Sequence, residues 1–170
     1  MRKLKTAYVV FLNKGKTQKA ILEQTKEEGN VIYGGRSIQK RIGVFSRPTE
    51  DYDIFSKKPK KSAVKTEKKL DKLHQDDLFY VKRAIHPGTW KVMSKGRDLK
   101  QNTKDDYGVV DYSKFPKPTP KFEVIDGVKY RSLAAEKKAK MKSLRDKEFA
   151  FRHKKDREDL NRIKLASGGK

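Results

Sequence analysis

A glycine turn followed by a closely spaced pair of acids places the tightest constraint on this chain of 170 residues. The apolar run 31–33 leads into Gly34 and Gly35, and Asp51 and Asp53 follow after a spacer. Successive side chains of a strand point to opposite faces, so a strand here would turn both acids to one face and the apolar residues beside them into the core. The pattern predicts a strand, a glycine turn and a second strand that presents two carboxylates.

Two carboxylates on one face repel each other unless a cation lies between them. A divalent ion is the obvious partner, because hard cations such as Mg²⁺ bind carboxylate oxygens together with the phosphates of a substrate. The turn favours the same ligand, since Gly34 and Gly35 let backbone amides approach a phosphate and Ser37 adds a hydroxyl donor. A helix opening at residues 38–40 would favour an anion at its N-terminus. We therefore expect a metal-binding phosphate site.

This arrangement resembles the polymerase-β-type nucleotidyltransferase superfamily, whose hallmark is a hydrophobic residue and a Gly-[Gly/Ser] turn followed by Asp-x-Asp. The chain looks most like the minimal members found among abortive-infection toxins, phages and large DNA viruses. Its spacer, residues 36–50, is longer than the family usually has. The resemblance implies an α+β fold, a small mixed β-sheet flanked by helices with further helices at the C-terminus. It also implies Asp51 and Asp53 as catalytic metal ligands, and nucleotide-binding roles for Gly34, Gly35, Arg36 and Ser37.

The family's site is completed by a third carboxylate on a neighbouring strand. Asp111 is the best candidate, because it ends a short apolar and aromatic run that would pair as a hairpin with residues 88–93. Asp126 competes with it, but Asp126 is followed by glycine, and this dipeptide is typical of a tight hairpin turn. Asp105 and Asp106 lie in a polar segment and are weaker candidates.

The resemblance continues into the C-terminal region. A helix that carries Lys140, Leu144 and Arg145, and the run Lys-Asp-x-x-Asp-Leu at 155–160, are similar to the closing helices of the family. In the family this region packs beside the active site and directs basic groups toward the nucleotide. The resemblance therefore adds Lys140, Lys155 and Asp159 to the nucleotide-binding candidates.

Charge indicates the class of partner. Lys and Arg total 44 against 22 Asp and Glu, so the formal net charge is +22. Such an excess repels itself and favours a polyanion, and we expect nucleic acid, with RNA favoured, rather than only a lysine-rich solvated surface. Residence in a large assembly such as a virion or a ribonucleoprotein would suit the same charge. The three histidines show no metal-ligand spacing, so no histidine-based zinc site is expected.

The chain has no cysteine, which excludes disulfides and thiolate metal sites and suits a reducing, cytoplasmic location in a host cell or, for a viral protein, the virion. The apolar run 7–12 is too short for a signal sequence or a membrane span and is expected to form an early strand or an interface segment. We divide the chain into a basic segment 1–16, a nucleotidyltransferase-like core 17–132, a helical region 133–165 and a tail 166–170, which its composition predicts to be disordered.

Local patterns predict the elements of the core. Helices are expected at 17–28, ended by Gly29, and at 64–73, after a basic linker at 56–62. Strands are expected at 31–33, around the acid pair, and in the segments 78–85, 88–93 and 107–113. The proline-rich stretch 115–120 is expected to be an extended linker.

Three functions are compatible with these features. The first is a metal-dependent enzyme that moves a nucleoside monophosphate from a nucleoside triphosphate to an acceptor hydroxyl, using Mg²⁺ or Mn²⁺. The second is a catalytically idle scaffold of the same fold that serves as a basic nucleic-acid-binding or virion protein. The third is a toxin held in check by an antitoxin, since the resemblance includes such proteins. No membrane partner is expected.

Overall fold

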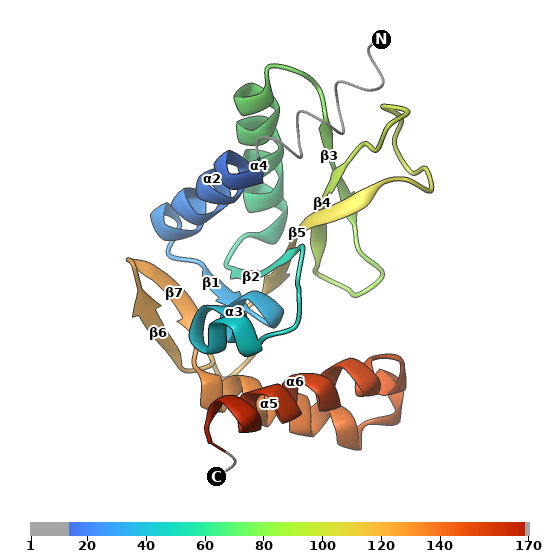
Figure 1. Cartoon of the computed structure of the whole chain (residues 1–170). Coiled ribbons are helices and arrows are strands. Elements are labelled where there is room, and N and C mark those ends of the chain that lie inside the picture. Colours follow the sequence, from blue (N-terminus) through green and yellow to red (C-terminus); the bar gives the residue numbers. More distant parts are fainter. Residues whose placement is uncertain (1–13, 169–170) are drawn as a thin grey trace.

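The computed structural model describes residues 14–168, which form a mixed seven-stranded sheet with helices packed around it (Figure 1). The strand order is β3-β4-β5-β2-β1-β7-β6, with parallel pairing between β2 and β5 and between β1 and β7 and antiparallel pairing elsewhere. The strands are β1 (Val31–Tyr33), β2 (Tyr52–Ser56), β3 (Phe79–Arg83), β4 (Trp90–Ser94), β5 (Tyr107–Lys114), β6 (Phe122–Ile125) and β7 (Val128–Arg131). The expected α+β fold is confirmed.

In Figure 1, α2 and α4 lie together above β1, β2 and β7, with β3 and β4 beside α4, whereas α5 and α6 lie side by side at the bottom and contact α3. The helices are α2 (Lys14–Glu27), α3 (Gly35–Ile42), α4 (Pro59–His74), α5 (Leu133–Arg145) and α6 (His153–Ala166), with 3₁₀ turns η1 (Gly43–Phe45) and η2 (Lys147–Arg152). No helix of the described residues is both long enough and apolar enough to span a membrane.

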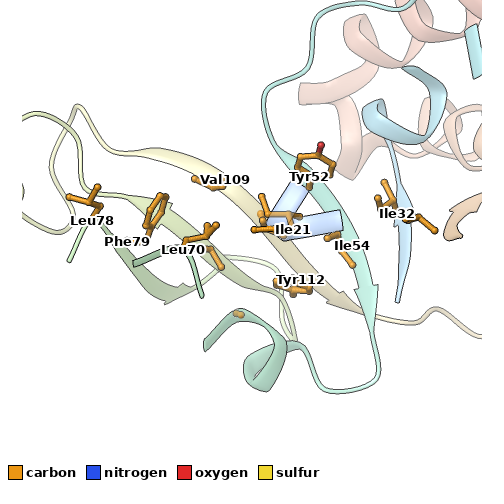
Figure 2. Packing of buried hydrophobic residues seen from close by; sticks show 14 of the residues in the cluster. Ile21, Ile32, Tyr52, Ile54, Leu70, Leu78, Phe79, Val109 and Tyr112 are labelled. Carbon is orange, nitrogen blue, oxygen red and sulfur yellow. The ribbon is translucent and has the colours of Figure 1, made fainter. Parts of the chain in front are cut away.

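The hydrophobic core lies where α2 and α4 cover the sheet (Figure 2). Ile54, Leu70 and Phe79 are completely buried there, and Ile21 of α2 packs into the same cluster. The hydroxyl groups of Tyr112 and Thr66 share a hydrogen bond of 2.7 Å, which satisfies both polar atoms inside the core. Burial of these apolar side chains, each contributing roughly 1.5–3 kcal/mol, supplies the main driving force for folding.

The alternation predicted for the acid-bearing strand is confirmed. Tyr52 and Ile54 of β2 are buried, while Asp53 between them is only partly buried. The predicted hairpin turn is also confirmed, because Asp126 and Gly127 join β6 to β7 and both have positive φ, 52° and 77°. This turn lies at the edge of the sheet, three strands from β2, so Asp126 cannot reach the acid pair.

Two predicted boundaries differ from the structure. The expected linker at 56–62 instead contains the start of α4, because Pro59 at the first helical position has a fixed φ and needs no hydrogen bond for a missing N–H. Helix α2 is already formed at Lys14, where the described residues begin, so it extends at least three residues before its predicted start at 17. The strand or interface segment expected at 7–12 lies outside the described residues.

Candidate active site

The structure places the two strongest acid candidates side by side. Asp53 of β2 and Asp111 of β5 are direct partners in the parallel pairing of these strands. Neighbouring strands are about 4.8 Å apart and paired residues point to the same face, so the two carboxyl groups project together. Asp51 precedes the strand and lies near the same face, because its charge raises the pKa of both Asp53 and Asp111. Tyr33 of β1 is the partner of Asp53 on its other side.

The charges at this face are poorly compensated. Burial, followed by the charges of Asp51 and Asp111, raises the pKa of Asp53 to about 7, although Lys155 and Arg152 oppose the shift. Burial also raises the pKa of Asp111, even though Lys91 contacts its Oδ2 at 2.8 Å. Asp111 Oδ1 is buried and has no hydrogen-bond partner among the described residues. A group that brings positive charge to this face would relieve both features.

These acids fit a divalent metal site. They offer carboxylate oxygens, the ligands that Mg²⁺ and Mn²⁺ prefer. One of these oxygens, Asp111 Oδ1, is buried and has no hydrogen-bond partner among the described residues. Within residues 14–168, the three acids that each bring one oxygen within 4.8 Å of the others are a different set, Asp98, Asp105 and Asp106. Asp51, Asp53 and Asp111 do not come this close to one another.

The loop acids already have other partners. Asp105 accepts hydrogen bonds from the backbone N–H of Arg97 and from Thr103, and these lower its pKa. Asp106 accepts from Thr103 and from the Tyr80 hydroxyl. The cluster therefore serves to fix the loop between β4 and β5, and nothing else in the structure points to a ligand there.

The glycine turn lies directly against the acid pair. Gly34 has φ 70° and ψ −144°, a conformation that is nearly restricted to glycine, and a Cβ at this position would lie 2.5 Å from Asp53 Oδ2. Its N–H donates a 2.7 Å hydrogen bond to Glu136 Oε1 of α5. Glu136 is fully buried and forms an ion pair with Arg131. The turn is thus fixed by a residue about a hundred positions away in the chain.

Helix α3 begins immediately after this turn, at Gly35 rather than at the predicted Ile38. The first N–H groups of a helix lack acceptors within the helix and attract anions. Arg36 lies over the Tyr52 ring, 4.5 Å from its centroid, and donates to the carbonyl groups of residues 50 and 51. Ser37 is buried, and its hydroxyl donates to the Arg131 carbonyl at 2.7 Å. Both side chains therefore bind backbone carbonyl groups of the protein itself.

The C-terminal candidates fall into two groups. Lys155 is exposed and close enough to Asp53 for its charge to oppose the rise in pKa. Lys140 is only 4% exposed and lies in a buried ionic network. Its Nζ is 2.7 Å from Asp159 and 3.0 Å from Asp156, while Arg47 contacts Asp159 and Arg152 contacts Asp156. This network joins α5, α6 and the segment that leads into β2.

Several residues of the site were not found by sequence reasoning. Lys91 is the β4 partner of Asp111, and only the register of β4 against β5 identifies it. Tyr33 stacks on Phe55 with ring centroids 3.8 Å apart, and Arg131 lies over both rings. Tyr33 directly precedes the glycine turn, so its position in the sequence was a usable signal. Glu136 and Arg131 carried no such signal.

Because its pKa is raised, Asp53 should make the stability of the protein depend on pH. Between about pH 4 and 7 the folded protein keeps the Asp53 proton, whereas the unfolded chain releases it. Because the folded state then binds more protons, the free energy of unfolding should fall as pH rises through this range. Thermal unfolding without divalent ions should show this fall in the wild type relative to Asp53→Asn, and Mg²⁺ should reverse it at pH 8. Parallel pH profiles for the two proteins would contradict the assigned environment of Asp53.

No known family model matches the chain, and no curated protein matches it in sequence. Solved structures do match its fold. The Megavirus polyadenylate synthase matches with a TM-score of 0.70 and 14% identity, over 92% of this chain and 32% of that one. Protein JHP933 of Helicobacter pylori matches with a TM-score of 0.51 and 16% identity, over 76% of this chain and 55% of that one. An H. pylori protein classed provisionally as a nucleotidyltransferase gives a TM-score of 0.50 and 16% identity, over 76% and 57%.

The chain therefore shares the fold of these proteins, which agrees with the nucleotidyltransferase-like fold that its sequence resemblance implied. It spans about a third of the viral enzyme and just over half of the bacterial proteins. At this level of identity the likeness concerns the fold, and one fold can carry different functions.

Proposed function

We propose that this protein is a metal-dependent nucleotidyltransferase, which moves a nucleoside monophosphate from a nucleoside triphosphate to an acceptor hydroxyl, with RNA as the acceptor. One observation carries the proposal. Asp53 and Asp111 are paired on adjacent strands beside the Gly34 turn, with one oxygen of Asp111 buried and unpaired. Two paired acids whose direct cationic partner among the described residues is Lys91 alone suit a site for cations and phosphates better than a structural role.

Each part of the site has a role in the proposed reaction. Asp51, Asp53 and Asp111 would hold the divalent ions, which supply stabilisation of the charge on the transferring phosphoryl group. The N-terminus of α3 and the exposed Lys155 would attract the triphosphate. The acceptor oxygen forms a bond to the α-phosphorus, the bond to the bridging oxygen breaks, and pyrophosphate leaves. The acceptor hydroxyl loses its proton to solvent as the new bond forms.

The choice of RNA as the acceptor rests on two features. The net charge of +22 favours a polyanionic partner, and an acceptor that is a small molecule or a protein side chain would leave this charge without a purpose. The matched viral protein is named as a polyadenylate synthase, and a polyadenylate is a polynucleotide chain. Divalent ions, triphosphate and an RNA 3′ hydroxyl would then meet at the Asp53 face.

A transfer assay tests the proposal. The full chain is incubated with single-stranded RNA and each of the four α-labelled ribonucleoside triphosphates, with Mg²⁺ or Mn²⁺. We expect labelled RNA that depends on the divalent ion and is absent with a chelator. RNA binding without labelling under any of these conditions would favour the idle scaffold instead.

Two glycine variants test the geometry of the turn. Gly34→Ala and Gly43→Ala should each lose about 1–2 kcal/mol of unfolding free energy, because both residues have positive φ. A Cβ on Gly43 would contact nothing within 4 Å, whereas one on Gly34 displaces the Asp53 carboxylate. Transfer should therefore fall by about 10²-fold in Gly34→Ala alone. Equal activities of the two folded variants would show that the turn does not position Asp53.

A further inference from the structure

A groove of about 840 Å³ opens at the start of α4, where the ends of β2 and β5 meet the beginning of β4. Lysine is the dominant residue of its lining, and no carboxylate contributes to it. Lys65, at one side, has Glu27 and Glu28 as partners. Six exposed lysines of the lining have no carboxylate within 4.0 Å among the described residues, namely Lys57, Lys58, Lys60, Lys61, Lys68 and Lys114.

A second basic hollow, of about 520 Å³, lies on α5 and is lined by Lys137, Lys138, Lys142 and Arg145, also without a carboxylate. Its lining contains no aromatic ring, in contrast to that of the groove. Lysines that converge on one concave surface without acids repel one another, so the groove attracts a ligand with several negative charges in a row. A chain of phosphates, which releases counterions when lysines neutralise it, has this chemistry.

The groove also contains an aromatic ring. Trp90 is the only tryptophan of the chain, and its side chain is partly exposed in the groove. The ammonium group of Lys60 lies 5.0 Å from the centre of the ring. Because Lys60 is exposed and flexible, a planar base can displace it from the ring while the ammonium group moves to a phosphate. Bases within a duplex are already stacked on one another, so a tryptophan platform selects unpaired bases.

We propose that this groove binds a single-stranded polynucleotide, with its lysines on the phosphates and a base stacked on Trp90. The groove and the acid site lie on opposite faces of β4 and β5, because Trp90 and its partner Tyr112 alternate with Lys91 and Asp111 along these strands. Lys114 lies three residues beyond Asp111, about 10 Å along the strand, so a bound polynucleotide would pass around the end of β5 to reach the acids. The inference that the groove guides the acceptor strand rests on the proposed function, whereas the inference that it binds a polynucleotide does not.

The single tryptophan makes a direct test available. The full chain is titrated with single-stranded RNA of about 20 nucleotides, with a chelator and without triphosphate, so that no transfer can occur. Tryptophan fluorescence and the anisotropy of end-labelled RNA are followed in the same titration. We expect quenching that saturates together with the anisotropy. Heparin, which carries charge but no bases, should bind without this quenching, and duplex RNA should quench less at equal phosphate concentration.

Matched charge variants locate the binding. Lys60→Gln, Lys61→Gln and Lys68→Gln are combined in one protein, and the control carries Lys137→Gln, Lys138→Gln and Lys142→Gln on the exposed face of α5. Each variant loses three positive charges. We expect the groove variant to bind RNA at least tenfold more weakly, with the slope of log K against log salt reduced by about 2, and the control to change by less than threefold. Trp90→Leu should weaken binding about tenfold with little change in the slope.

Three results would overturn the proposal. They are equal losses in the groove and α5 variants, RNA binding that leaves the fluorescence of Trp90 unchanged, and equal quenching by heparin. Circular dichroism and thermal unfolding of each variant exclude loss of fold as the cause. If the RNA binds as expected but the wild type transfers no nucleotide, the groove stands and the proposed enzymatic function fails.

Discussion

Replacing Asp53 with asparagine should reduce nucleotide transfer by at least about 10³-fold and at the same time stabilise the protein in the absence of divalent ions. The loss follows because Asp53 would hold the metal ions, whose stabilisation of the transferring phosphoryl group amounts to several kcal/mol. The gain follows because Asp53 is a partly buried acid next to Asp51 and Asp111, with a pKa raised to about 7. An amide of the same shape removes this repulsion at neutral pH.

The opposite signs of these two effects distinguish a functional acid from a structural one. Transfer is measured in the RNA labelling assay, and stability by thermal unfolding at pH 8 with a chelator. Asp105→Asn is the matched control, since it makes the same change in the acid cluster of the β4–β5 loop. It should keep transfer within about threefold. Transfer that survives in Asp53→Asn but is lost in Asp105→Asn would move the metal site to the loop.

Strand β2, which carries Asp53, shows what local sequence patterns can predict. Alternation around Asp53 gave the face of each side chain, and the Asp126-Gly127 dipeptide gave the β6–β7 turn, because both depend on residues that are neighbours in the chain. The strand that carries Asp111 was expected as part of a hairpin beside β2. The structure confirms this position, with β5 between β4 and β2.

Contacts between distant segments could not be predicted in this way. The Gly34 N–H is held by Glu136, 102 residues away, and Arg47 pairs with Asp159 across 112 residues. Nothing in a local pattern distinguishes Lys140, which is buried, from its exposed neighbours Lys137 and Lys138 on the same lysine-rich helix. The basic groove was missed for the same reason, since the residues expected to form a solvated linker instead begin α4 beside Trp90.

The large positive charge is therefore divided between different tasks. Lys140, Arg47 and Arg152 neutralise buried acids and hold the C-terminal helices against the core. Lys155 and Arg152 act on Asp53 from the face where the triphosphate is proposed to bind. The lysines at the start of α4 have no acids to neutralise and remain available to a ligand. Net charge alone does not separate these roles, whereas burial and the presence of a partner do.

Replacing Lys140 with methionine should lower the free energy of unfolding by roughly 3 kcal/mol. The change leaves two buried acids, Asp156 and Asp159, without their shared cation, and loss of one member of a buried ion pair costs about 3–5 kcal/mol. The lower end applies because Arg152 and Arg47 remain as partners of these acids. Urea unfolding measures the loss as a shift of the midpoint at constant slope.

The same loss should depend on pH. Burial raises the pKa of Asp156, but the hydrogen bond and charge of Lys140 outweigh it and hold this pKa below its usual value of 3.8. Stability from the lowered pKa is present above about pH 3.8 and is lost at lower pH, so the difference between the wild type and Lys140→Met should narrow in acid. The control, Lys137→Met on the exposed face of the same helix, should stay within about 0.5 kcal/mol of the wild type at every pH. A difference that persists unchanged in acid would mean that Lys140 stabilises the fold by packing alone, and that the ionic network does not fasten the C-terminal helices to the site.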